Sequence, residues 1–109
     1  MKDLSRFTNQ EVSELFKKAR RALRHPGFDI LCAYAKNKTG RILVITSAKV
    51  GSAPQRNKIR RRLKSIFLEE KLFERGLDCI VVVKKPGIEL GFEELGALLR
   101  DALEVMDEA

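Results

Sequence analysis

The chain has 109 residues, of which 44% are hydrophobic and 34% charged, and its formal net charge is +7. This length and balance fit one globular domain with a modest core and argue against a disordered chain. No apolar run approaches the ~20 residues that cross a bilayer, and the first seven residues lack the apolar segment of a secretory signal. We therefore expect a single domain over residues 1–109, located in the cytoplasm and without a membrane partner.

The first helix is predicted from Thr8 to about Arg24. Thr8 and Glu11 have the spacing of a capping box, in which each side chain bonds the other residue's backbone amide. His25-Pro26-Gly27 is expected to end the helix. Its apolar stripe would consist of Val12, Leu15, Phe16, Ala19 and Leu23.

Two strands are predicted next, over residues 28–36 and 41–47. The segment 37–40, Asn-Lys-Thr-Gly, has the composition of a turn, so we expect the two strands to form an antiparallel hairpin. Both cysteines lie in apolar, strand-like runs, Cys32 here and Cys79 further along. We expect both to be buried, reduced thiols.

A second helix is predicted over residues 54–72, a buried strand over 77–84 and a last helix over 92–106. The second helix would bury Ile59, Leu63, Ile66 and Phe67. One side of the last helix carries Phe92, Leu95, Leu99, Ala102, Leu103 and Met106. The resulting order, helix-strand-strand-helix-strand-helix, indicates an α+β fold with helices packed on a small mixed sheet.

The net charge is concentrated in one segment, residues 48–64, which has no acidic residue. The rest of the chain carries 15 basic and 15 acidic residues, because the segment accounts for 7 of the 22 basic ones. Such a concentration of charge favours a polyanionic partner. The seven basic residues are Lys49, Arg56, Lys58, Arg60, Arg61, Arg62 and Lys64.

On a helical wheel, Asn57 and Arg61 fall nearly opposite the apolar stripe, and Lys64 lies close to them. Arg62 lies nearer the stripe. Arg56 also falls on the apolar side, so either it reaches outward from the first turn or its stem packs against the edge of the core. Lys58 and Arg60 flank the stripe, which leaves most of the basic residues free to meet phosphates.

Residues 48–63, AKVGSAPQRNKIRRRL, resemble the signature of the bacterial ribonuclease P protein subunit. That signature is Lys-Lys, an apolar residue, Gly, any residue, Ala-Val, any residue, then Arg-Asn and further basic residues. The resemblance extends over nearly the whole chain. It departs from the pattern at Ala48, where a lysine is usual, at Pro54, where valine is common, and at Ser65, where glutamate is frequent.

The resemblance implies an RNA-binding domain that assists the removal of the 5′ leader from precursor tRNA. The fold would be like that of ribosomal protein S5 domain 2, with a left-handed β-α-β crossover. The partners would be the ribonuclease P RNA, which performs the hydrolysis with bound Mg²⁺, and precursor tRNA, with no protein partner required. The residues expected to bind RNA are Lys49, Gly51, Arg56, Asn57, Lys58, Arg60, Arg61 and Lys64.

Phe16 is expected to line the cleft for the single-stranded leader, because two aromatic residues are frequent in the family's first helix and Val12 occupies the other position. From the residues alone we add Tyr34 as a ring on which a base can stack. The competing interpretation of Phe16 is a core side chain. No catalytic residue and no metal ligand is expected in this chain, since its one histidine, His25, has no suitable partners.

Two other functions stay open at this point. A ribosomal or ribosome-assembly protein would use the same basic helix only as structural support. A self-sufficient nuclease would need carboxylates to hold Mg²⁺, and the candidates are Asp78, Glu69 and Glu70. Surface acids are the competing interpretation of those three side chains.

Overall fold

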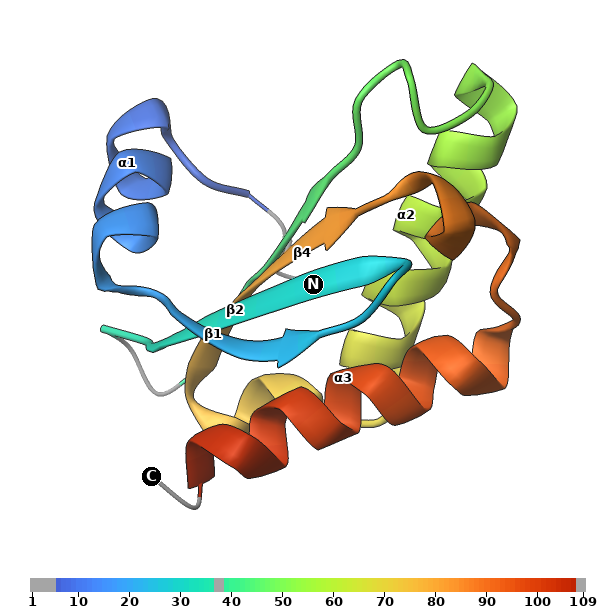
Figure 1. Ribbon diagram of the computed structural model, residues 1–109. Helices are drawn as coiled ribbons and strands as arrows, with labels where there is room; N and C mark the ends of the chain where they lie inside the picture. Colours follow the sequence, from blue (N-terminus) through green and yellow to red (C-terminus); the bar gives the residue numbers. More distant parts are fainter. Residues whose placement is uncertain (1–5, 37–38, 108–109) are drawn as a thin grey trace.

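The computed structural model describes residues 6–36 and 39–107 and forms a small α+β domain with a four-stranded mixed sheet (Figure 1). Asn37 and Lys38 of the predicted turn lie outside the described residues, as do residues 1–5. The elements are α1 (Asn9–Lys18), β1 (Arg20–Arg24), β2 (Phe28–Tyr34), β3 (Ile42–Ile45), α2 (Ala53–Glu69), the 3-10 helix η1 (Leu72–Arg75), β4 (Leu77–Val83), the 3-10 helix η2 (Lys85–Glu89) and α3 (Phe92–Asp107).

The first helix is shorter than predicted, because residues 20–24 form a strand. Thr8 caps α1 with the expected capping box, but the helix ends at Lys18 and Ala19 has extended backbone angles. The chain then pairs antiparallel with β2. Residues 17–24 have good helix propensity, but pairing along the edge of the sheet outweighs that weak local preference.

The predicted hairpin between residues 28–36 and 41–47 is wrong. The strand order is β1-β2-β4-β3, so β2 lies between β1 and β4, and β3 pairs parallel with β4 at the edge. The actual hairpin is β1–β2, closed by Pro26 and Gly27, with paired backbone bonds between His25 and Phe28. Gly27 has no room for a side chain, because a Cβ there would lie 2.6 Å from the Cα of Gly87.

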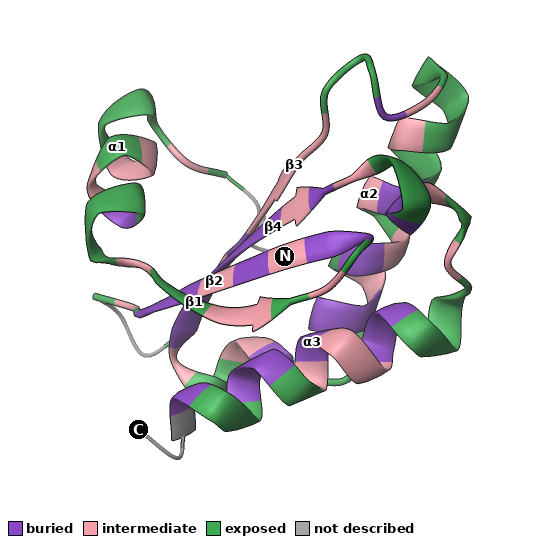
Figure 2. Cartoon of the chain, in the orientation of Figure 1, coloured by how far each residue is buried: buried purple, intermediate pink, exposed green. Residues whose placement is uncertain are grey.

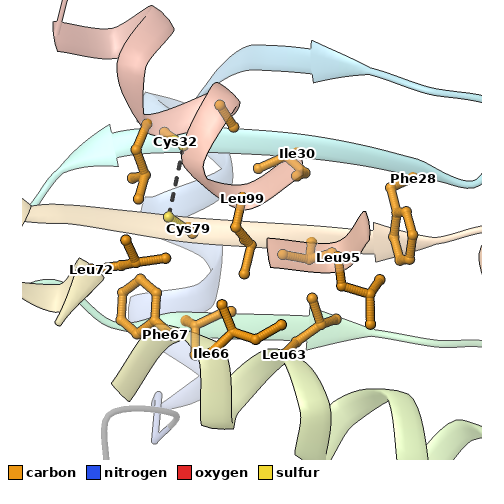
Figure 3. Close-up of a cluster of buried hydrophobic side chains, with 14 of the residues drawn as sticks. Phe28, Ile30, Cys32, Leu63, Ile66, Phe67, Leu72, Cys79, Leu95 and Leu99 are labelled. Atoms are coloured by element: carbon orange, nitrogen blue, oxygen red, sulfur yellow. Dashed lines mark hydrogen bonds between the residues drawn. The ribbon is translucent and has the colours of Figure 1, made fainter. Parts of the chain in front are cut away.

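One face of the sheet, which we call the covered face, packs against α2 and α3 (Figure 1). The predicted stripe of α2 is buried as expected, and so are Leu95, Leu99, Ala102, Leu103 and Met106 of α3. Figure 3 shows the aromatic and aliphatic side chains of this core around Phe67 and Leu72. Phe92 was expected on the same side of α3 but is 44% exposed, since it stands in the first turn, beyond the end of the packed stripe.

The two cysteines are buried and free, as predicted, and they are also neighbours. Cys32 and Cys79 are register partners on β2 and β4, and the Cys32 thiol donates to Cys79 with the sulfur atoms 3.8 Å apart (Figure 3). This hydrogen bond and burial raise the pKa of Cys79 well above its ordinary value of 9.0. Cys79 is therefore an uncharged core side chain at neutral pH.

The opposite face of the sheet, which we call the open face, packs against α1 near one end. There Leu15 of α1, Ala33 of β2 and Ile80 of β4 are buried together. The remaining apolar side chains of this face are only half-buried, as the intermediate shading of β3 in Figure 2 illustrates. They are Leu31, Leu43, Ile45 and Val82. The sheet therefore has one fully packed side and one side whose apolar surface stays partly accessible.

Candidate RNA interface

The basic helix α2 starts at a second capping box, which the sequence analysis did not identify. The Ser52 hydroxyl accepts from the Gln55 amide at 3.3 Å, and the Gln55 side chain accepts from the Ser52 amide at 2.9 Å. Pro54 stands in the first turn, where its missing N–H costs nothing. These local contacts start the helix at Ala53, one residue before the predicted position.

The buried stripe of α2 determines which of its cations face outward. Because Ile59, Leu63 and Ile66 pack into the core, Arg61 and Lys64 on the far side are exposed, and Lys58 is exposed as well. An open hollow runs along this side of the helix. It is lined by Ala53, Pro54, Asn57, Arg60, Arg61 and Lys64, four of which are predicted RNA-binding residues.

Arg60 is held in place by two hydrogen bonds. Its guanidinium donates to the Asn57 side-chain oxygen at 3.2 Å and to the Thr46 hydroxyl, just after β3, at 2.6 Å. The side chain therefore spans from α2 to the edge of the sheet. Thr46 was not singled out from the sequence, because only the fold brings residues 46 and 60 together.

The other predicted RNA-binding residues lie around the start of α2. Lys49 is exposed in the loop after β3, while its neighbour Val50 is buried and anchors that loop. Gly51 is half-buried beside Gln55, whose side chain would contact a Cβ at 2.7 Å. Arg56 is half-buried and its Nε atom is buried without a hydrogen bond, in line with a stem packed against the edge of the core.

The two aromatic residues predicted for the leader cleft are both exposed but stand on different sides of the sheet. Phe16 follows the buried Leu15 on α1 and is 44% exposed, so its core interpretation does not describe this structure. Tyr34 ends β2 and is 67% exposed, and its hydroxyl lies 3.4 Å from the Met106 carbonyl of α3. Strand alternation turns Tyr34 away from Ala33 and toward the α3 side.

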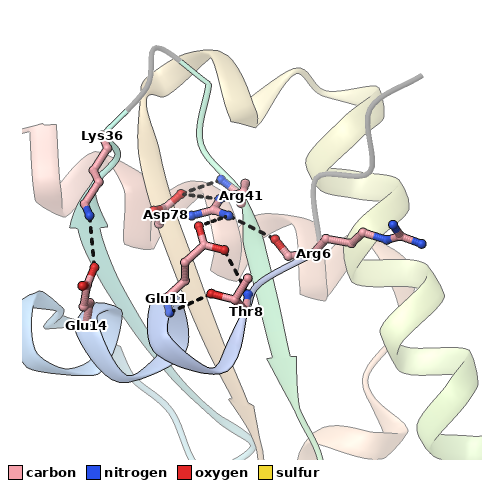
Figure 4. A network of polar contacts seen from close by, with 7 residues as sticks. All are labelled: Arg6, Thr8, Glu11, Glu14, Lys36, Arg41 and Asp78. Carbon is pink, nitrogen blue, oxygen red and sulfur yellow. Dashed lines mark hydrogen bonds and ion pairs between the residues drawn. The ribbon is translucent and has the colours of Figure 1, made fainter.

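A polar network connects α1 to the sheet beside the open face (Figure 4). Arg41 donates to the Glu11 carboxylate at 2.8 Å and to the Arg6 carbonyl at 3.1 Å, and its guanidinium lies 4.2 Å from the centre of the Phe7 ring. Hydrogen bonds from the Thr8 amide and from Arg41 hold the pKa of Glu11 below its ordinary value of 4.5.

A second ion pair at the same end joins α1 to the residues after β2. Lys36 contacts Glu14 at 3.0 Å, and this hydrogen bond and charge lower the pKa of Glu14 (Figure 4). The Lys36–Glu14 contact is exposed and the Arg41–Glu11 contact only partly buried, so we expect them to position α1 more than to stabilise the fold.

The acidic residues considered for a nuclease have structural partners. Asp78 is buried and accepts from the Arg41 amide at 2.8 Å, and burial raises its pKa above 3.8. Glu69 accepts from Ser65 and Glu70 from Arg100. Within residues 6–36 and 39–107, no three His, Cys, Asp or Glu side chains form a group that could hold a metal ion.

Comparison with known proteins agrees with the arrangement of the basic helix on this fold. The family model described as Ribonuclease P matches residues 2–107. The chain belongs to the ribonuclease P protein family. It is 35% identical over 88 residues to the ribonuclease P protein component of Bacillus pumilus, covering 79% of this chain and 73% of the relative. The component of Finegoldia magna is 29% identical over 92 residues, covering 84% and 80%.

Solved structures of ribonuclease P proteins share the fold. The Staphylococcus aureus protein superposes with a TM-score of 0.78 at 22% identity, covering 96% of each chain. The Thermotoga maritima protein gives a TM-score of 0.76 at 21% identity, covering 92% of this chain and 94% of that protein.

Membership of the ribonuclease P protein family indicates the process in which the chain takes part. It is a subunit of an endoribonuclease that matures the 5′ end of tRNA, and a ribosomal role is not favoured. Its partner is RNA. Among the described segments, no helix is both long and apolar enough to cross a membrane.

Proposed function

We propose that the outward side of α2 binds the ribonuclease P RNA and that the open face holds the 5′ leader of precursor tRNA. The observation that carries the first part is the division of α2 into a buried apolar stripe and an exposed basic side. The cations can meet phosphates while the stripe stays in the core. Arginines and Asn57 together offer forked phosphate contacts and hydrogen bonds to base edges or 2′-hydroxyls.

Arg60 and Arg61 have different parts in this contact. Arg60 is fixed by Asn57 and Thr46, so it presents its charge at a defined place with little further loss of side-chain entropy. Arg61 is exposed and adapts to the RNA surface. Lys49, Gly51, Arg56, Lys58 and Lys64 complete the proposed RNA-binding set.

The open face suits a single RNA strand because it combines an apolar surface with an exposed ring. The half-buried side chains of β2, β3 and β4 offer a surface for bases, and Phe16 stands on α1 at its border. A base stacked on such a ring contributes about 1–3 kcal/mol. Tyr34 remains in the proposal as a stacking ring, but on the α3 side it would contact a strand that continues past the end of β2.

Hydrolysis in this proposal takes place on the RNA subunit. Mg²⁺ would be held mainly by that RNA and by the substrate, and it would activate the attacking water and stabilise the leaving oxygen. The residues of this chain bind the leader, position the substrate and reduce the repulsion between RNA phosphates. We propose that the chain acts in the cytoplasm as a single RNA-binding domain over residues 1–109, with no further protein partner.

Reconstitution with a bacterial ribonuclease P RNA at low Mg²⁺ tests this proposal. Precursor-tRNA cleavage is measured with RNA alone, with protein alone and with both. We expect the protein to stimulate the RNA-catalysed reaction and to cleave nothing by itself. Cleavage by RNA-free protein would overturn the division of labour, and a lack of stimulation would overturn the assigned role.

A further inference from the structure

The edge strand β1 carries three exposed arginines that the proposed function does not use. The side chains of Arg20, Arg21 and Arg24 have no hydrogen bond or ion pair with any described residue. The basic and acidic residues outside residues 48–64 are equal in number, but three of the basic ones lie together on β1. Some of the acids that balance these cations in the sequence lie at the end of α2, such as Glu69 and Glu70.

A bulge in β1 places two of these arginines on the same face of the sheet. The register pairs Arg21 with Leu31 and Arg24 with Asp29, and it shifts between Arg21 and Leu23. Residues three apart on a regular strand point to opposite faces, so this shift is what aligns them. Leu31 belongs to the open face, and Arg21 and Arg24 therefore border that face.

Arg20 points the other way. Its register partner is Cys32 of the covered face, and it shares a hollow with Tyr34 and Met106 on the α3 side. Ala22 and Leu23 also pack against the covered core. β1 therefore directs Arg21 and Arg24 to the open face, while Ala22 and Leu23 pack on the covered face and hold the strand in the fold.

Asp29, the acidic residue opposite Arg24, already forms an ion pair with another residue. The Asp29 carboxylate lies 3.0 Å from the Lys84 ammonium, directly after β4, which already supplies a counter-charge. No acid of the described chain contacts Arg21. Both guanidinium groups are therefore available to an anion.

Cations stand at both edges of the sheet, but only those of β1 point to the open face. β1 and β3 are the two edges of the sheet, about 14 Å apart at the ~4.8 Å spacing of neighbouring strands. Arg60 reaches the β3 edge through Thr46, and Arg21 and Arg24 stand at the β1 edge. The apolar side chains of β2 and β4 lie between them.

We infer that Arg21 and Arg24 bind phosphates of the 5′ leader of precursor tRNA, so that β1 forms a cationic border of the leader site. This inference rests on the proposed function of the open face. It adds a pair of substrate-binding residues on an element separate from α1 and α2.

The test uses the reconstituted holoenzyme and compares neighbouring residues of one strand. Affinities for precursor tRNA with a leader and for mature tRNA are measured against salt for R21Q/R24Q, R20Q and the wild type. We expect R21Q/R24Q to bind the precursor about tenfold more weakly, with a salt slope lowered by up to about 1.4, since each phosphate contact to a single strand contributes about 0.7. Mature tRNA binding should not change, and R20Q should behave like the wild type.

Three controls complete the experiment. R21K/R24K should keep most of the precursor affinity, because a phosphate accepts a lysine charge. Unfolding by urea should be unaltered in all variants, since the side chains are exposed. Affinity for the ribonuclease P RNA should also be unaltered.

The inference is overturned if R21Q/R24Q binds the precursor like the wild type, loses both tRNAs equally, or loses the ribonuclease P RNA instead. A wild-type holoenzyme that does not distinguish precursor from mature tRNA would instead count against the proposed function.

Discussion

The covered and open faces of the sheet differ in what their side chains are available to do. On the covered face, Phe28, Ile30 and Cys32 of β2 are at most 1% exposed under α2 and α3. On the open face of the same strand, Leu31 is half-buried, and α1 packs only near one end. One strand therefore contributes at once to the core and to a surface that can bind a ligand.

The difference shows how a small RNA-binding domain separates stability from function. Most of the buried apolar side chains lie between the sheet and two amphipathic helices on one side, so the other side need not be fully packed. The cations follow the same division, since they lie on the outer side of α2 and along β1 rather than in the core.

The largest expected effect compares one substitution on the two faces. Leu99→Ala on α3 should lower the free energy of unfolding by about 2–5 kcal/mol, because it removes a fully buried side chain and leaves a cavity. Leu31→Ala should lower the free energy of unfolding clearly less, since that side chain is already partly exposed to solvent. Urea denaturation measures both. Equal losses would mean that the open face is packed like the core.

The next effect concerns RNA binding by the outer side of α2. Arg60→Ala with Arg61→Ala should weaken binding to the ribonuclease P RNA and lower the slope of log K against log salt by up to about 2. The matched control is Lys36→Ala with Arg100→Ala, which removes the same charge from two surface ion pairs. A slope that falls equally in both variants would show that only net charge matters.

A smaller effect separates the two exposed phenylalanines. Phe16 and Phe92 are both 44% exposed and both lie on helices, but Phe16 is on α1 beside the open face. Phe16→Ala should weaken the binding of leader-bearing precursor tRNA by about 1–3 kcal/mol relative to the binding of mature tRNA, because base stacking is lost. Phe92→Ala should change neither affinity. If Phe16→Ala weakened both tRNAs equally, its role would be packing.

The smallest effect is the pH dependence of the contacts that hold α1. The folded-state pKa values of Glu11 and Glu14 lie below the ordinary 4.5, so their stabilisation is present above that pH and is lost as pH falls through the lowered values. Glu11→Gln should flatten this acid-side loss, measured by urea unfolding between about pH 3 and 6.

Asp78 acts in the opposite direction, because burial raises its folded pKa above 3.8 and stability falls as pH rises through that interval. Asp78→Asn should remove this opposing slope while keeping an acceptor for the Arg41 amide. An acid-side loss unchanged by Glu11→Gln would show that the α1 contacts do not contribute.

Much of α2 could be predicted from the sequence, because its function and its packing depend on one local period. Ile59, Leu63 and Phe67 recur at helical spacing, and the exposed positions of Arg61 and Lys64 follow from that spacing alone. The burial of Cys32 and Cys79 could also be predicted from the sequence, since both lie in apolar runs. The prediction of the RNA-binding residues beyond this exposure rests on the family resemblance.

The pairing of the strands could not be predicted from the sequence in the same way. Turn-like residues after β2 predicted a hairpin with β3, but β2 pairs with β1 and β4, which alone brings Cys32 beside Cys79. Residues 20–24 continue a helical pattern in the sequence, although they form an edge strand. Local propensity differs by tenths of a kcal/mol per residue, whereas pairing at a sheet edge satisfies several backbone groups at once.

The sequence by itself determined where an amphipathic basic helix forms and which of its sides faces the core, since both depend on neighbours three or four residues away. Only the tertiary structure decided that Arg21 and Arg24 share a face, because that depends on a bulge in the register with β2. It also decided that Thr46 holds Arg60. Such contacts join residues far apart in the chain, and no local period encodes them.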